Sequence, residues 1–126
     1  MPFPLLFHRI LSFGRRSEIL AIDYLRTLGY RIVTSAYRAN GGEVDVIAWD
    51  GNVLVFVEVK ARQTAEPPED AVGFMKQQRI IRAAQAYLSK HHLHEVPYRF
   101  DTLAVHAPPR SKPGFRLLRD AFNMYN

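Results

Sequence analysis

Residues 42–60 read GEVDVIAWDGNVLVFVEVK and contain two runs of β-prone residues around Asp-Gly-Asn at positions 50–52. A turn sequence of this kind between apolar runs indicates a tight β-hairpin. We therefore predict strands over residues 43–49 and 53–60. In the second strand the valines alternate onto one face, and Leu54 and Phe56 lie on the other. Apolar residues on both faces are typical of a strand covered by a layer on each side.

The second predicted strand ends in an acid and a base that share a face, Glu58 and Lys60. The position of Asp45 relative to them depends on the turn. If Gly51-Asn52 is a two-residue loop, Asp45 lies opposite Glu58, with their Cβ atoms roughly 4.5–5.5 Å apart. If Asp50-Gly51 is the loop, Asp45 lies diagonal to Glu58 on the same face. An unbulged three-residue loop would turn Asp45 to the other face.

Two carboxylates at this distance repel each other, so a proton, a cation or a bound metal must compensate them. Magnesium prefers oxygen ligands and is often held by one or two carboxylates together with water and substrate phosphate. Asp45, Glu58 and Lys60 therefore predict hydrolysis of a phosphodiester bond assisted by Mg²⁺ or Mn²⁺. The ion would polarise the phosphate and activate water, and the lysine would orient that water or stabilise developing charge. The alternative is a surface ion pair of Glu58 with Lys60 and a solvated Asp45.

Composition narrows the classes of protein and partner. The chain has 126 residues, 48% hydrophobic and 23% charged, which fits one globular domain. It contains no cysteine, which excludes disulfides, thiol catalysis and cysteine-ligated metal sites. The net charge is +5, and 13 of the 17 basic residues are arginine, the side chain that binds phosphate through a forked contact. Nucleic acid or another anionic surface is the partner that this balance favours.

The remaining chain supplies a helix, strand and loop pattern around the hairpin. Hydrophobic periodicity predicts helices over residues 14–28 and 74–90, and β-prone runs predict strands over 30–37 and 98–106. Gly41-Gly42 marks a turn, residues 63–70 read as a loop, and residues 115–122 form a short closing segment. A strand, helix and strand in succession favour a parallel crossover. The expected fold class is α/β, a mixed central sheet flanked by helices.

Residues 1–13 precede this predicted domain of residues 14–126 and form an apolar arm. The arm is interrupted by Pro4, His8 and Arg9 and has neither a basic leader nor a small-residue cleavage site, so it is a poor signal peptide. We expect it to pack on the domain or on a second subunit. With no membrane segment predicted, we expect a cytoplasmic protein.

The motifs GEVDVIA at residues 42–48 and VFVEVKAR at 55–62 resemble the YraN-type family of small bacterial proteins. That family is grouped with the PD-(D/E)xK nuclease superfamily and is similar to archaeal Holliday-junction resolvases. The resemblance extends over about residues 14 to 106. It implies a restriction-endonuclease-like fold, a Mg²⁺ or Mn²⁺ cofactor, a DNA substrate that includes branched DNA, and a homodimer.

The same resemblance assigns roles residue by residue. It places Asp45, Glu58 and Lys60 at the catalytic positions, and it implies that Glu18 joins Asp45 and Glu58 as a metal ligand. Without the resemblance, Glu18 is an ordinary acid in the first turn of a helix. Two residues depart from the family pattern: Ser17 stands where glycine is usual, and Ala36 where asparagine is common. Both departures concern substrate contacts more than metal binding.

Basic residues on the second predicted helix are candidates for contacts with DNA phosphates. Lys76, Arg79 and Arg82 recur every three residues beside the apolar stripe, and Gln77 lies among them. Arg62 lies on the same face of its strand as Glu58 and Lys60 and is also a candidate for contact with a DNA phosphate. The alternative for each is a solvated surface. The alternative for the whole chain is a catalytically weak or inactive nucleic-acid-binding protein of the same fold.

Overall fold

The computed structural model describes residues 13–68 and 71–124 and contains two helices and five strands in that part of the chain. Two predicted elements, the helix at 74–90 and the strand at 98–106, have the predicted bounds, and the other elements differ by one or two residues at their ends. The elements in order are α2 (Phe13–Thr27), β1 (Arg31–Ala39), β2 (Gly42–Asp50), β3 (Val53–Arg62), α3 (Phe74–Lys90), β4 (Tyr98–His106) and β5 (Gly114–Phe122).

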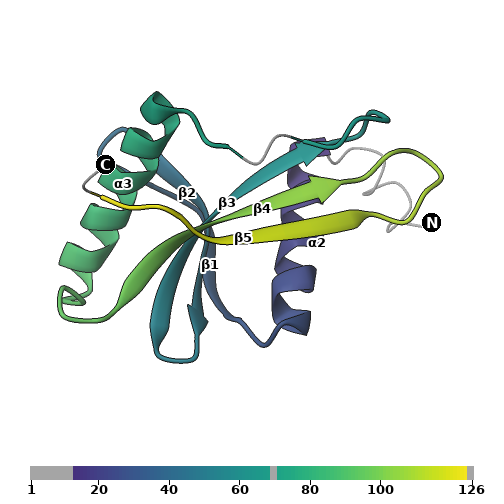
Figure 1. Ribbon diagram of the computed structural model, residues 1–126. Helices are drawn as coiled ribbons and strands as arrows, with labels where there is room; N and C mark the ends of the chain where they lie inside the picture. The colour runs from purple at the N-terminus through teal and green to yellow at the C-terminus, as the bar shows by residue number, and fades with distance from the viewer. Residues whose placement is uncertain (1–12, 69–70, 125–126) are drawn as a thin grey trace, which may run out of the picture.

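The five strands form one mixed sheet in the order β1-β2-β3-β4-β5 (Figure 1). Strands β3 and β4 are parallel, and the other neighbouring pairs are antiparallel. Helix α3 makes the crossover between the two parallel strands, as the strand, helix and strand succession predicts. The predicted α/β class with a mixed sheet flanked by helices is therefore confirmed.

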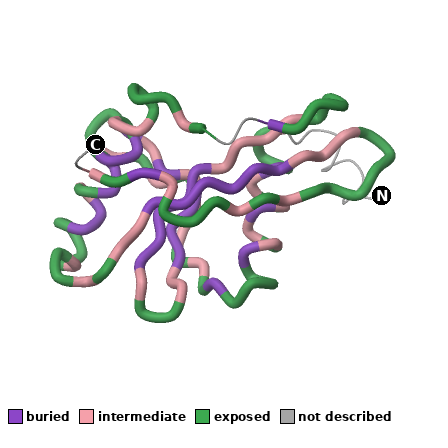
Figure 2. The backbone as a smooth tube through the Cα atoms, in the orientation of Figure 1, coloured by how far each residue is buried: buried purple, intermediate pink, exposed green. Residues whose placement is uncertain are grey.

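Each face of the sheet has its own core, because β3 is apolar on both faces. Leu54 and Phe56 pack on the α3 side, and Val55 and Val57 pack on the α2 side; all four are 0% exposed. Figure 2 shows the buried segments concentrated where the strands cross the centre of the molecule. Fully burying one such side chain contributes roughly 1.5–3 kcal/mol, so β3 is the strand that holds both layers together.

The loop from β2 to β3 settles the register that the sequence leaves open. Asp50 pairs with Val53, so Gly51 and Asn52 form a two-residue loop, and Gly51 has a φ of 60°. This is the first of the three turn geometries considered for the hairpin. It places Asp45 one position beyond the last ladder pair on the side of Glu58.

The loop from β1 to β2 lies one residue earlier than predicted. Asn40 and Gly41 form it, with φ of 52° and 74°, as a tight hairpin turn with two left-handed residues requires. Gly42 is already paired with Ala39 and is buried. A Cβ on Gly42 would lie 1.9 Å from the carbonyl oxygen of Arg79, so glycine is needed there for close packing on α3.

Two expectations concern the ends of the chain and the membrane. Residues 1–12 of the predicted apolar arm lie outside the described residues. The predicted closing segment is β5, an edge strand antiparallel to β4. Neither helix in the described part of the chain has the length and apolar character needed to cross a bilayer.

Candidate functional site

The backbone pairing of β2 with β3 ends next to Asp45. Beyond that point a side-chain hydrogen bond of Asp45 replaces the backbone hydrogen bonds between the two strands. The last ladder pair is Val46 with Val57. Beyond it, the N–H of Val59 donates to Oδ2 of Asp45 at 2.8 Å. This contact holds the carboxylate against β3 beside Glu58, while the backbone of β2 turns away. The hairpin thus opens where the two acids meet.

Glu58 is 5% exposed, and its carboxyl group lies near enough to that of Asp45 for the two to interact. Burial, followed by the charge of Asp45, raises the pKa of Glu58 from 4.5 to about 8. Nζ of Lys76 lies 3.1 Å from Oε1 of Glu58 and acts in the opposite direction. Of the three compensations expected for adjacent carboxylates, a cation is therefore present, and the raised pKa of Glu58 favours the second, a bound proton.

The cation beside Glu58 comes from α3 and not from β3. Lys60 shares a face of β3 with Glu58, but its ammonium group donates to the backbone carbonyl of Ala71, just before α3. The alternative expectation of a surface ion pair between Glu58 and Lys60 is wrong, because Glu58 is buried and its ion pair among the described residues is with Lys76. The side chain of Lys76 is 48% exposed, so it reaches the buried acid from solvent.

Glu18 does not join the two other acids. It lies on α2, with its side chain 16% exposed and paired with Arg15 at 2.5 Å. Within residues 13–68 and 71–124, no three His, Cys, Asp or Glu side chains gather closely enough to hold one ion. The structure therefore brings together two of the three expected metal ligands, Asp45 and Glu58.

The donors present nevertheless fit a hard divalent cation. Asp45 and Glu58 offer carboxylate oxygens, the ligands that Mg²⁺ and Mn²⁺ prefer. Thr102 lies beside Glu58 in the parallel ladder and is 1% exposed, and its hydroxyl has no hydrogen-bond partner among the described residues. The raised pKa of Glu58 favours its protonated form near neutral pH, and the cation beside it is a half-exposed lysine. An ion bound by the two carboxyl groups would displace that proton and compete with Lys76.

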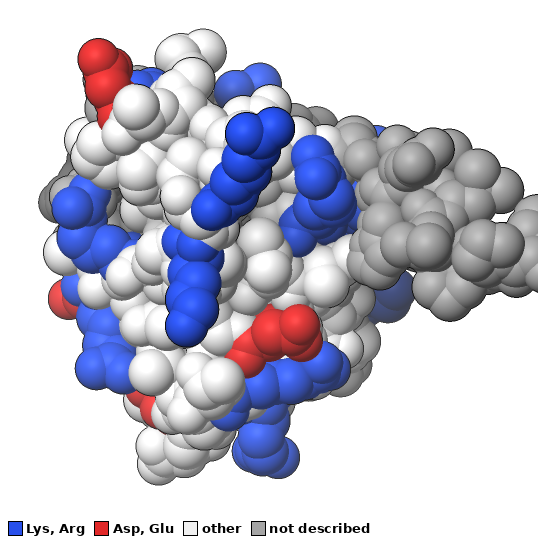
Figure 3. All heavy atoms as spheres, turned by 90° about the vertical axis from the view of Figure 1, so that its right-hand side faces the viewer, with Lys and Arg blue, Asp and Glu red and all other residues white. Residues whose placement is uncertain are grey.

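The expected DNA-contacting residues have different surroundings. Gln77 donates to the carbonyl oxygen of Val72 at 2.7 Å, and Arg62 lies 3.8 Å from Glu66. Arg79 and Arg82 are both exposed on α3. Figure 3 shows that Lys and Arg side chains predominate on the face seen from the right-hand side of Figure 1, towards which β3 and β4 point. That face is suited to an anionic partner, but it is a different part of the surface from α3, which lies on the left in Figure 1.

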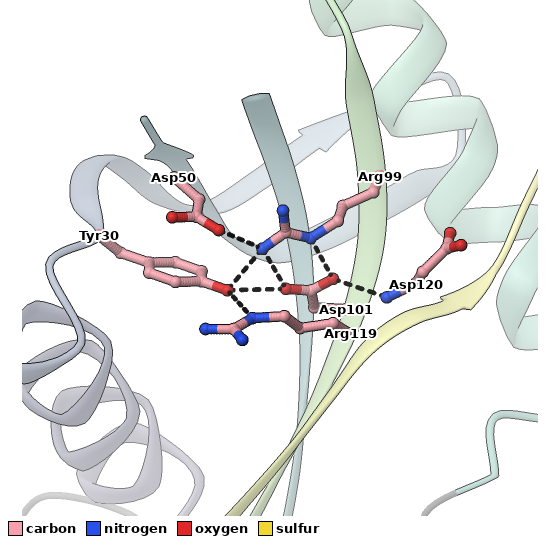
Figure 4. Close-up of polar contacts among 6 residues, drawn as sticks. All are labelled: Tyr30, Asp50, Arg99, Asp101, Arg119 and Asp120. Atoms are coloured by element: carbon pink, nitrogen blue, oxygen red, sulfur yellow. Dashed lines mark hydrogen bonds and ion pairs between the residues drawn. The ribbon is translucent and has the colours of Figure 1, made fainter. Parts of the chain in front are cut away.

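A second polar cluster lies where β2 ends and β4 begins, and sequence reasoning did not identify it as a cluster. We call it the Arg99 network (Figure 4); it consists of Tyr30, Asp50, Arg99, Asp101, Arg119 and Asp120. Arg99 contacts Asp101 through Nε at 2.9 Å and Asp50 through its terminal nitrogen at 2.7 Å. Its members come from four segments distant in sequence, so no local pattern reveals it.

Comparison with known proteins gives a consistent family. The sequence model of the uncharacterised protein family UPF0102 matches residues 17–105. A UPF0102 protein of Geobacter sulfurreducens is 41% identical over 119 residues, 93% of this chain and 93% of the relative. One from Hahella chejuensis is 39% identical over 99% of this chain and 100% of the relative. One from Chlorobium chlorochromatii is 50% identical over 73% of this chain and 72% of the relative.

Proposed function

The chain belongs to the uncharacterised protein family UPF0102, and we propose that it is a metal-dependent endonuclease that hydrolyses phosphodiester bonds in DNA, including branched DNA. The observation that carries the proposal is the pair of Asp45 and Glu58 at the opening of the hairpin. A buried acid with a pKa of about 8 against a second carboxyl group is destabilising for a structural core. Such an arrangement is common where a protein holds a cation or moves a proton.

In this proposal Asp45 and Glu58 hold Mg²⁺ or Mn²⁺. Glu18, the third ligand that the resemblance implies, is paired with Arg15 in the structure and would have to leave it to reach the ion. When bound, the ion supplies a Lewis acid for the phosphate and a water molecule of lowered pKa. The N–H of Val59 keeps Asp45 oriented towards that position. Lys60 lies on the same face two residues after Glu58. Once released from the carbonyl of Ala71, its ammonium group would orient the attacking water or stabilise developing charge.

The architecture supports a restriction-endonuclease-like core. The hairpin of β2 and β3 runs into a parallel crossover through α3 to β4. The YraN-type resemblance points to the same fold. Cutting two symmetric strands of a branched DNA requires two sites, so we propose that the active form is a homodimer. The apolar arm is the candidate contact between its subunits.

A panel of DNA structures tests the proposal. Linear, flapped and four-way substrates are incubated with the protein in Mg²⁺, Mn²⁺ or EDTA. We expect cleavage that requires the ion, with Lys60→Ala abolishing cleavage but retaining DNA binding. Cleavage in EDTA, or unchanged cleavage by Lys60→Ala, would contradict the assignment.

A second candidate function is binding of DNA without cleavage. The observations that favour it are the contact of Lys60 with Ala71 and the position of Glu18 away from the two acids. In that case the same panel gives salt-sensitive binding, and no substrate is cut with either ion. A protein that neither binds nor cuts any DNA would contradict both candidates.

A further inference from the structure

A pocket of about 470 Å³ lies between the β1–β2 turn and the first turns of α3. The turn residues 39–42 form one wall, and Arg38, Glu43, Lys76 and Arg79 supply the charged side chains. Three cations from two distant parts of the chain thus surround one hollow, with a single acid among them. Arg82, one turn further along α3, does not line it.

The charge of the pocket favours an anion. Glu43 interacts with Arg38, with 3.5 Å between Oε1 and Nε. Among the lining residues this leaves an excess of two positive charges, one on Arg79 and one on Lys76, which also contacts Glu58. The side chain of Arg38 is 77% exposed, so its guanidinium group is accessible to a ligand. Arginine binds phosphate through two parallel hydrogen bonds, and lysine adds a point charge.

The walls of the pocket are fixed by close packing. Gly42 approaches the backbone of Arg79 so closely that no side chain fits between the turn and α3. The left-handed residues Asn40 and Gly41 close the turn directly above this contact. The distance between Arg38 on β1 and Arg79 on α3 is therefore set by the backbone, and not by flexible side chains alone.

Lys76 connects this pocket to the carboxyl pair. Its side chain lines the pocket while its Nζ lies 3.1 Å from Oε1 of Glu58. We propose that the pocket is a subsite for a backbone phosphate of DNA, adjacent to the phosphate cleaved at Asp45 and Glu58. This inference rests on the proposed function for the nature of its ligand. It adds Arg38 to the substrate-binding residues. It also assigns a phosphate contact in the pocket to Arg79 and none to Arg82.

The test is the affinity for a fluorescent DNA duplex in EDTA, measured by anisotropy over a range of salt concentrations. We expect Arg38→Gln and Arg79→Gln each to weaken binding about tenfold and to lower the salt slope by about 1, as loss of one phosphate contact does. Arg82→Gln is expected to have a smaller effect than Arg79→Gln. Arg31→Gln, an exposed arginine at the other end of β1, is the control and leaves the affinity unchanged.

Glu43→Gln provides a change of opposite sign. It removes the acid that interacts with Arg38, so DNA binding is expected to become tighter. Equal effects of Arg79→Gln, Arg82→Gln and Arg31→Gln would overturn the subsite, while DNA binding by the wild type would leave the proposed function standing.

Inorganic phosphate separates the two sources of a phosphate group. If it raises the melting temperature of the wild type but not of Arg38→Gln, while DNA affinity is the same in both, the pocket binds a free phosphate compound. That result would overturn the assignment to the DNA backbone. If both DNA and phosphate depend on Arg38, the assignment is supported.

Discussion

Two buried acids on neighbouring strands differ in how their charge is compensated. Asp101 on β4 is 0% exposed and lies beside Val57, one residue before Glu58 on β3. It accepts hydrogen bonds from Arg99 at 2.9 and 3.2 Å, from Tyr30 at 3.1 Å and from the backbone N–H of Asp120 at 3.0 Å. Glu58 faces the other layer, where burial and the charge of Asp45 raise the pKa of its carboxyl group to about 8, and its ion-pair partner among the described residues is the ammonium group of Lys76.

The difference indicates different roles. The donors around Asp101 are the guanidinium group of Arg99, the buried hydroxyl of Tyr30 and a backbone N–H, so that acid is part of the folded framework. The partners of Glu58 can be exchanged, because a proton can leave and a half-exposed lysine can move. A buried acid whose partners can be exchanged is a candidate for ligand binding, whereas one whose partners are fixed has a structural role.

The largest expected effect is a loss of folding stability when the partner of Asp101 is removed. Arg99→Ala leaves Asp101 buried without its main partner, and this costs about 3–5 kcal/mol in the free energy of unfolding, measured by urea titration. Arg119→Ala is the control within the Arg99 network. Arg119 is exposed and makes one 3.2 Å contact with Tyr30, so its removal should cost less than about 1 kcal/mol. Similar losses in the two variants would remove the distinction between the regions.

The second effect is the pH dependence of stability, which depends on the titration of Glu58. In EDTA, both folded and unfolded chains hold the Glu58 proton below its ordinary pKa of 4.5. Between 4.5 and about 8 the unfolded chain has lost that proton while the folded chain keeps it, so stability falls as pH rises. A shift of this size corresponds to about 5 kcal/mol over the full titration, of which about 3.5 kcal/mol falls between pH 5 and pH 8.

Glu58→Gln tests the source of that slope, because glutamine carries no titrating proton. We expect the fall in melting temperature between pH 5 and pH 8 to become shallower in this variant. Glu66→Gln is the matched control, since the Glu66 side chain is 86% exposed and should leave the slope as in the wild type. A slope that is the same in all three proteins would show that Glu58 titrates normally.

The third effect distinguishes a catalytic role of Lys60 from a role as a positive charge alone. Lys60→Arg keeps the positive charge but replaces a compact ammonium group with a planar fork on a longer stem. If Lys60 positions water, a displacement of about 1 Å lowers the cleavage rate on the order of 100-fold. Folding and the binding of DNA and Mn²⁺ should be retained. Cleavage at the wild-type rate would mean that Lys60 serves only as a counter-charge.

The sequence predicted the parts of the fold that depend on local patterns. Helix α3 and strand β4 have the predicted bounds, because periodicity and flanking prolines are properties of neighbouring residues. That Asp45 lies beside Glu58 was also predictable, since a two-residue turn fixes the register of a hairpin, although the backbone ladder ends one pair earlier, at Val46 and Val57. The turn at Asn40 and Gly41 was misplaced by one residue because Gly42 serves packing on α3, which the local sequence does not reveal.

The partners of the acids could not be predicted in the same way. Lys76 reaches Glu58 across a crossover, and Arg99 contacts Asp50 from a strand 49 residues away. Lys60 was the nearest cation in sequence, but its side chain extends to Ala71 instead. Which cation meets a buried acid depends on how helices pack on the sheet, and that is set by tertiary contacts.

The smallest expected effect is the stabilisation of the carboxyl pair by a divalent ion. At an ion concentration ten times the dissociation constant, binding linkage adds about 1.4 kcal/mol, a rise of a few degrees in melting temperature. Mg²⁺ should produce this rise in the wild type at pH 9, where Glu58 is largely ionised. Lys76→Gln should give a larger rise at the same ion concentration, because the competing ammonium group is gone.

Two further variants serve as controls for the stabilisation by Mg²⁺. Asp45→Asn keeps the shape of the side chain but removes one charge, so the rise with Mg²⁺ should shrink. Lys90→Gln removes a positive charge from the last turn of the same helix, away from the acids, and should behave as the wild type. If Lys76→Gln and Lys90→Gln respond alike, Lys76 does not compete with the ion. If Asp45→Asn also responds as the wild type, the ion binds elsewhere, and the contrast between Glu58 and Asp101 is one of electrostatics without a ligand.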